Sequence, residues 1–166
     1  MFKEISTKDI KENAFDLIGN EWMLVAARKA DGSVNAMTAS WGGFGVMWGK
    51  DVAFVVIRQT RYTKEFMDEA KAFSLSFFDE SYKEMLGYMG KISGRNEDKI
   101  AKCKLNVNGN IPIFNESRMT LVCKSMFAQI LEEDSFLSKE ALDKWYPDKN
   151  MHTLYIAEIE KAIVRE

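Results

Sequence analysis

The 166-residue chain contains one histidine, two cysteines and two prolines. A single histidine, His152, excludes metal sites that need several histidines, and we expect no metal centre. No nucleophile elbow accompanies it, which disfavours a serine hydrolase triad. The cysteines, Cys103 and Cys123, lack the close spacing of metal or redox pairs. We therefore expect two reduced thiols that pack in the core.

Long stretches of one residue kind are also missing. The net charge is −2 and no basic block occurs, which argues against nucleic acid or an anionic membrane as the main partner. No apolar run reaches the length of a membrane-spanning helix. The first residues, Met1-Phe2-Lys3-Glu4, lack the apolar segment of a signal peptide. These absences lead us to expect a cytoplasmic protein.

The familiar nucleotide-binding motifs are absent. The segment Gly42-Gly43-Phe44-Gly45 lacks GxGxxG spacing and precedes a strand instead of opening a helix, so a Rossmann site is disfavoured. There is no P-loop lysine motif. The glycines are flanked by Trp41, Met47 and Trp48, and we predict a loop with aromatic walls. Such a loop could pack as an ordinary turn, or its backbone could approach a flat ligand closely.

The pattern of apolar residues predicts one mainly β domain over residues 1–166, a β-barrel with a few short helices. A turn at Asp31-Gly32 predicts a hairpin between the first two strands. The strand at 73–77 alternates strictly and should be half-buried. The predicted strands are 22–28, 34–40, 52–57, 73–77, 119–131 and 153–164, and the predicted helix caps are Thr63, Ser81, Asn96 and Ser138.

The residues after the buried strand at 52–57 suggest an anion site. Arg58 and Arg61 lie in the short loop before the predicted start of a helix at Thr63. Helix N-termini carry unpaired amides and favour negative charge, and arginine binds phosphate oxygens in bidentate fashion. The same arginines could instead be solvated charges paired with Glu65 or Asp68. Residues alone leave both interpretations open.

Five short motifs give the chain its resemblance to a known family. The sequence resembles the flavin reductase-like family, FMN-binding split barrels of Greek-key type that include flavoredoxins. The resemblance covers residues 22–163, although Ala157 replaces a usual glycine and 106–117 cannot be aligned. The motifs are Asn35-Ala36-Met37-Thr38-Ala39-Ser40-Trp41, residues 58–66, Phe73-Ser74-Leu75-Ser76-Phe77, Ser93-Gly94-Arg95 with Asp98-Lys99, and residues 152–156 leading to Glu158.

The resemblance implies roles for four of the five motifs. Residues 37–41 of the first motif would line the flavin ring, with Trp41 or Trp48 screening one face from water. The second would hold the flavin phosphate, and the 93–95 loop would approach the cofactor. His152 would be the catalytic candidate near the ring, donating a hydrogen bond and titrating near neutrality. The implied cofactor-binding residues are Met37, Thr38, Ala39, Ser40, Trp41, Arg58, Thr60, Arg61, Thr63, Lys64, Ser93, Gly94 and Arg95.

The resemblance also implies an FMN-dependent oxidoreductase, with NADH or NADPH as the electron donor. Electrons would pass through bound FMN to free flavin, a ferric complex or a protein. A second hypothesis is a flavoredoxin-type carrier that keeps its FMN and has no nicotinamide site. A third is a non-catalytic barrel that senses or stores flavin, or has lost it. A homodimer is expected because split barrels commonly build the flavin cleft between two subunits.

Overall fold

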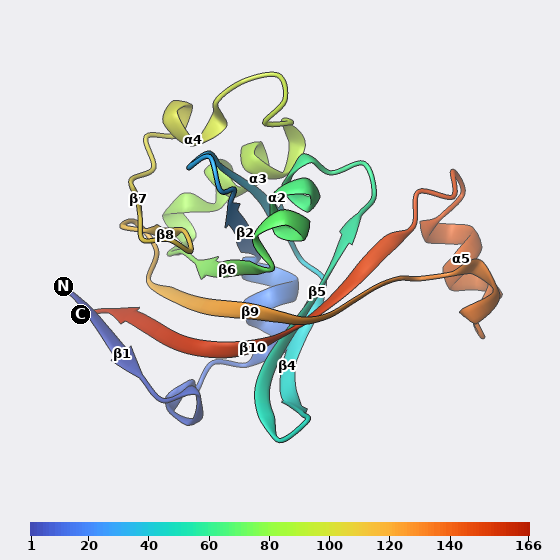
Figure 1. Cartoon of the computed structure of the whole chain (residues 1–166), viewed down its shortest axis with the longest axis horizontal. Helices are drawn as coiled ribbons and strands as arrows, with labels where there is room; N and C mark the ends of the chain where they lie inside the picture. The colour runs from blue at the N-terminus through green and yellow to red at the C-terminus, as the bar shows by residue number, and fades with distance from the viewer.

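An antiparallel sheet of eight strands forms the frame of the computed structural model, which describes residues 1–166 (Figure 1). The order along the sheet is β3-β2-β6-β9-β10-β5-β4, and β1 pairs with β10. The short strands β7 and β8 pair separately. The strands are β1 (Phe2–Ile5), β2 (Met23–Arg28), β3 (Val34–Ala39), β4 (Gly42–Met47), β5 (Lys50–Arg58), β6 (Ala72–Phe77), β7 (Val107–Asn108), β8 (Ile113–Phe114), β9 (Met119–Ile130) and β10 (His152–Arg165).

Short helices flank the sheet, as the sequence predicted. None of them is both long and apolar enough to cross a membrane. The α-helices are α1 (Ala14–Asp16), α2 (Tyr62–Ala70), α3 (Lys83–Lys91), α4 (Lys99–Lys102) and α5 (Lys139–Trp145). Single turns of other helix types are η1 (Thr7–Asp9), η2 (Leu17–Glu21), η3 (Glu80–Tyr82) and η4 (Glu133–Ser135).

The predicted hairpin and the central strand are both confirmed. Strands β2 and β3 pair antiparallel around a turn in which Gly32 adopts a φ of 88°. A residue with a side chain rarely adopts a positive φ, whereas glycine, which has no Cβ atom, does so readily. Glycine therefore suits this turn. The apolar run at 52–57 lies within β5, whose partners are β4 and β10. Branched apolar side chains suit such a paired and largely buried strand.

Two predictions about strands are wrong. The strand at 73–77 is buried on both faces, because β8 and Ser117 cover the face that carries Ser74 and Ser76, while α3 packs on the neighbouring strands β2 and β3. Ser76 Oγ lies 3.0 Å from Thr120 Oγ1, so the buried Ser76 hydroxyl has a hydrogen-bond partner. The glycine cluster is the strand β4 and not a loop. Gly42 is needed there because a Cβ atom would lie 2.4 Å from the Phe54 carbonyl oxygen, which is fixed in β5.

Three of the four predicted helix caps are wrong. Helix α2 begins at Tyr62 with Arg61 as N-cap, two residues before the predicted Thr63. Helix α3 has no side-chain cap, and Asp98 caps α4 in place of Asn96. The cap of α5 is confirmed, since Ser138 Oγ accepts a hydrogen bond of 3.2 Å from the Ala141 amide. Helix ends vary by one or two residues, and the observed caps Arg61 and Asp98 each lie two residues from the predicted ones.

An arm of residues 131–151 joins β9 to β10 and carries α5. It extends away from the body of the molecule, on the right of Figure 1. Its base is closed by a hydrogen bond of 2.8 Å from the Leu131 amide to the His152 carbonyl. Most arm residues are exposed. We call this segment the β9–β10 arm, and it covers one side of the site described next.

Candidate active site

A cavity of about 360 Å³ lies beneath the β9–β10 arm, and we call it the arm cavity. Four elements meet there: the end of β3, the end of β5, the start of β10 and helix α5. The register places His152 opposite Arg58, which brings the ends of β5 and β10 together. The residues that line the arm cavity are Met37, Thr38, Ala39, Ser40, Trp41, Val56, Arg58, Arg61, Trp145 and His152.

A second cavity, of about 150 Å³, opens at the N-terminus of α2 and is called the helix cavity. It shares Met37 and Arg61 with the arm cavity, so the two spaces adjoin. Three of its lining residues are cations and none is a carboxylate. Its lining residues are Asn35, Met37, Thr60, Arg61, Tyr62, Thr63, Lys91, Ile92, Ser93, Gly94 and Lys99.

The backbone of the helix cavity suits an anion. No side chain caps α2. The Lys64 amide bonds the Arg61 carbonyl at 3.1 Å, which leaves the Tyr62 and Thr63 amides of this nine-residue helix for an anion. Thr63 is 1% exposed, and its Oγ1 accepts a hydrogen bond of 2.8 Å from Asn35 Nδ2. A Cβ atom at Gly94 would lie 2.0 Å from Asn35 Oδ1, so only glycine allows the 93–95 loop to approach this closely.

Lys99 supplies a buried positive charge to the helix cavity. The residue is 3% exposed, and its Nζ donates to the Met89 carbonyl at 2.6 Å and the Ile92 carbonyl at 2.8 Å. An ammonium group has three donors, so one remains unused. Burial, and then the charge of Arg61, lowers the pKa of Lys99 to about 8. No carboxylate compensates it, which makes the cavity attractive to an anion.

Arg61 connects the two cavities. One guanidinium nitrogen donates to the Gly90 carbonyl at 2.6 Å, which leaves other donors free. Burial and the nearby charge of Arg58 lower the pKa of Arg61, although an arginine stays protonated. Arg61 therefore presents a fixed cation at the junction.

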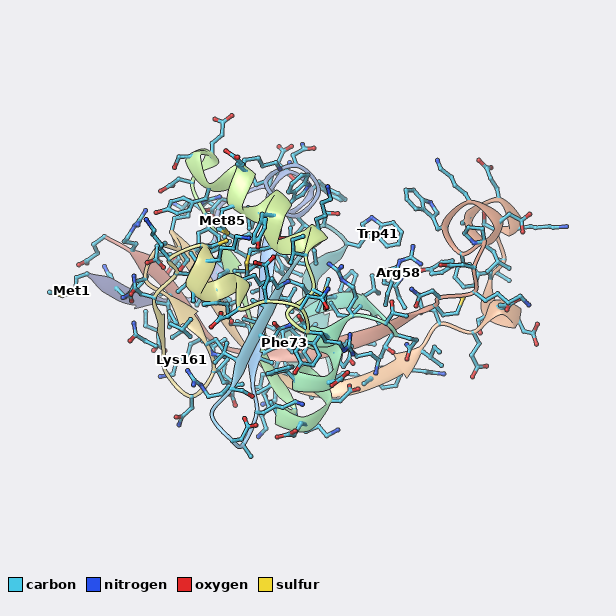
Figure 2. All side chains as sticks on the ribbon, turned by 90° about the horizontal axis from the view of Figure 1, so that it is seen from above. Met1, Trp41, Arg58, Phe73, Met85 and Lys161 are labelled. Carbon is cyan, nitrogen blue, oxygen red and sulfur yellow. The ribbon has the colours of Figure 1, made fainter.

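Arg58 has a different role, because its guanidinium binds the β9–β10 arm. It donates to the Asn150 carbonyl at 2.8 Å and to the Trp145 carbonyl at 2.9 Å. Its guanidinium carbon also lies 5.3 Å from the centre of the Tyr146 ring, within cation–π range. Figure 2 shows Trp41 and Arg58 in the region between the body and α5. Arg58 thus anchors the arm over its cavity.

Aromatic side chains form the wall of the arm cavity. The ring centres of Trp41 and Trp145 lie 4.9 Å apart in an edge-to-face arrangement, and those of Trp41 and His152 lie 5.1 Å apart. Burial, and then the charge of Arg58, lowers the pKa of His152 to about 4. The expectation that His152 titrates near neutrality is therefore wrong. Its ring is neutral at physiological pH.

Comparison with known proteins gives this arrangement a family. Residues 15–166 match the model of the flavin reductase like domain. The chain belongs to the flavin reductase-like family. No curated protein sequence matches this flavin reductase-like domain.

Solved structures share the fold of this flavin reductase-like domain. Flavoredoxin of Desulfovibrio vulgaris (Miyazaki F) is 23% identical, covers 98% of this chain and 78% of its own, and gives a TM-score of 0.69. An FMN-binding domain of a flavin reductases-like enzyme from Shewanella baltica is 16% identical, with coverage of 99% and 77% and a TM-score of 0.69. A split barrel domain protein from Shewanella frigidimarina is 16% identical, with coverage of 98% and 76% and a TM-score of 0.70. The predicted split barrel is confirmed.

The structure brings most of the sequence-predicted site residues of this flavin reductase-like domain to the two adjoining cavities. Lys64 and Arg95 lie outside both linings. Lys64 Nζ pairs with Asp68 at 2.6 Å, while Arg95 pairs with Glu65 and donates to the Thr60 carbonyl at 3.1 Å. The sequence had left open that Arg58 or Arg61 pairs with Glu65 or Asp68, and in the structure Arg95 and Lys64 occupy these two carboxylates instead.

Trp48 is also absent from the cavities. It lies in the turn between β4 and β5, and its ring centre is 6.4 Å from that of Phe127. Sequence reasoning gave no site role to Asn35, Lys91, Lys99 or Trp145, all of which line the cavities. Asp98-Lys99 had been noted only as part of a motif. No local pattern in the sequence predicts that a lysine is buried, or that α5 lies near the end of β3.

Proposed function

We propose that this flavin reductase-like domain binds FMN across both cavities and acts as an FMN-dependent oxidoreductase. The phosphate would occupy the helix cavity and the flavin ring the arm cavity. The observation that supports this most is the junction at Arg61, where an aromatic-walled space adjoins a small space with three cations and no carboxylate. The donors of the helix cavity suit a phosphate, and the aromatic wall suits a flat ring.

Each group of residues would make a separate contribution. Lys99, Arg61 and the Tyr62 and Thr63 amides of α2 would hold the phosphate. Residues 38–41 would orient the ring, and the hydrogen bond of 2.6 Å from Thr38 Oγ1 to the Leu86 carbonyl fixes this segment. Trp41 and Trp145 would exclude water. When bound, FMN supplies the hydride and electron chemistry.

The electron donor decides between an enzyme and a carrier. We propose a reduced nicotinamide as donor, and free flavin, a ferric complex or a protein as acceptor. The alternative is a flavoredoxin-type carrier that receives electrons from a protein.

Cys103 and Cys123 are free thiols, which supports a reducing compartment such as the cytoplasm.

Anaerobic reduction of the FMN-loaded protein tests this function. We expect NADH or NADPH to bleach the flavin absorbance in a stopped-flow experiment, with dithionite as the control that shows the flavin is reducible. If dithionite bleaches the flavin and both nicotinamides fail, the reductase is excluded and the carrier remains. If the protein neither retains FMN nor gains thermal stability from it, the FMN proposal itself is wrong.

We further propose that the domain is a homodimer whose interface adjoins the arm cavity. Val56 lines this cavity, and Phe54, two residues away on the same face of β5, is 39% exposed. Phe127 lies opposite Ile156 of β10, which itself pairs with Phe54, so the apolar face continues across the sheet. Exposed apolar patches of this kind favour protein contacts. The exposed apolar residues of these strands and their turn are Val46, Met47, Trp48, Phe54, Met126, Phe127 and Ile130.

Introducing charge into this face should separate the subunits. We expect the wild-type protein to sediment as a dimer at micromolar concentration, and the double variant Phe54→Glu with Phe127→Glu to sediment as a monomer. Buried unpaired carboxylates are costly, which gives the expected direction. The control is Phe15→Glu, at an exposed aromatic residue of α1 outside this face. A monomeric wild-type protein that still holds FMN would refute the dimer.

A further inference from the structure

A buried hydrogen bond joins the β9–β10 arm to the candidate catalytic histidine. The Tyr146 hydroxyl lies 2.8 Å from His152 Nδ1. Tyr146 follows directly on the last residue of α5, whereas His152 is the first residue of β10. Both residues are buried, at 7% and 8% exposure. Water therefore competes little for this contact.

The protons of this pair can be assigned from its chemistry. His152 is neutral, so one ring nitrogen carries a proton and the other accepts. Burial raises the pKa of Tyr146, so its phenol stays protonated. No other group of the chain bonds the Tyr146 hydroxyl. Donation to Nδ1 is then the arrangement that satisfies the phenol proton, and it leaves the imidazole proton on Nε2.

The remaining ring nitrogen of His152 is free to act on a ligand. Nε2 makes no hydrogen bond within the chain, and His152 lines the arm cavity. The neighbouring cation, Arg58, already directs its guanidinium to two carbonyl groups of the arm. An Nε2–H group would therefore be a neutral donor of fixed direction in this cavity.

We propose that Tyr146 is a positioning residue that holds His152 as its Nε2–H tautomer, so that His152 donates one hydrogen bond to a carbonyl oxygen of the molecule in the arm cavity. The proposal about the ligand rests on the function proposed above. Two sources offer such an oxygen, the carbonyl groups of the flavin ring and the carboxamide of a nicotinamide. The role of His152 is then donation without proton transfer, and not general acid–base catalysis.

The Tyr146 hydroxyl can be removed without removing the packing of its ring. The ring centre lies 5.4 Å from that of Phe136, and the Arg58 guanidinium lies over one face. Phenylalanine keeps both contacts. Tyr146→Phe therefore isolates the hydrogen bond to Nδ1.

Nuclear magnetic resonance of the protein without FMN tests the tautomer directly. The chain has one histidine, so the imidazole ¹⁵N signals of a tag-free, ¹⁵N-labelled sample belong to His152 without further assignment. We expect an unprotonated Nδ1 and a protonated Nε2 in the wild-type protein, and a shift toward the other tautomer in Tyr146→Phe. A protonated Nδ1 in the wild type, or an unchanged pattern in the variant, would overturn the proposal. Because no flavin is present, this outcome is independent of whether the protein binds FMN.

Two amide substitutions test what His152 does in the loaded protein. A glutamine places its amide nitrogen near the position of Nε2, and an asparagine places it near that of Nδ1. The measured quantities are the flavin affinity and the rate of reduction by the nicotinamide. We expect His152→Gln to keep both within about threefold of wild type, and His152→Asn to lower one of them about tenfold, the effect of losing one hydrogen bond. Tyr146→Phe should lie between them. Equal losses in His152→Gln and His152→Asn would exclude the donor role.

The quantity that changes identifies the source of the carbonyl. If His152→Asn weakens FMN and riboflavin binding equally, the acceptor is on the flavin ring. If it slows reduction by the nicotinamide and leaves flavin affinity and dithionite reduction intact, the acceptor is the carboxamide. Either result supports the proposal, whereas a variant that is normal by both measures contradicts it.

Discussion

Replacing Arg61 with alanine should weaken FMN binding by about 30-fold to 100-fold, the range expected for lost charge-assisted hydrogen bonds to a phosphate. The affinity for riboflavin, which lacks the phosphate, should fall less than about threefold, because no such hydrogen bond is lost. The physical reason is that Arg61 lines both cavities and spends one donor on Gly90, so its remaining donors can reach an anion. Fluorescence titration of both flavins measures the two affinities.

Two other arginines provide matched comparisons for Arg61. Arg58→Ala should reduce FMN and riboflavin affinity by similar factors, because Arg58 holds the arm through the Trp145 and Asn150 carbonyls. Arg95→Ala should leave both affinities near wild type, since Arg95 is paired with Glu65 outside the cavities. Equal losses for both flavins in Arg61→Ala would mean that Arg61 does not hold the phosphate. A loss specific to FMN in Arg58→Ala would restore the role that the sequence suggested for it.

FMN affinity should fall as the pH rises above 8, while riboflavin affinity should not. In the unliganded protein the pKa of Lys99 is lowered to about 8, so the lysine loses its proton above that pH. A phosphate dianion beside it favours the charged form, and binding must then take up one proton. The logarithm of the FMN dissociation constant should rise by up to about one for each pH unit above 8. Titrations of both flavins between pH 7 and pH 9.5 would show this.

The variant Lys99→Gln is the control for this pH dependence. It has no proton to lose, so its FMN affinity should be lower than wild type at neutral pH and nearly independent of pH. The phosphate itself is a dianion across this range and contributes no slope, because its second pKa is about 6. A wild-type slope that persists in Lys99→Gln would assign the titration to another group.

Local signals in the sequence were sufficient for much of the fold. The run at 52–57, the turn at Asp31-Gly32 and the cap at Ser138 each depend on neighbours in the chain, and all three were predicted correctly. The alternation at 73–77 was misleading because β8 and Ser117 cover the face that carries the serines. Local polarity indicates exposure only when nothing packs on the polar side.

The candidate site was predictable in its position and not in its details. The segments around Thr38 and Arg61 meet as the family resemblance implied. Which cations face the cavities depended on partners distant in sequence. Arg95 is drawn away by Glu65, whereas Lys99 is held inward by two carbonyl groups near the end of α3. Such contacts form only when the chain is folded.

By itself, the sequence determined that this is a mainly β domain with an anion-suited loop after a buried strand, because strand patterning and helix starts are local properties. The tertiary structure alone decided that Arg58 anchors the arm, that Lys99 is buried, and that Tyr146 reaches His152. The direction of a charged or polar side chain depends on which partner the fold brings within hydrogen-bond distance, and no spacing along the chain specifies that partner.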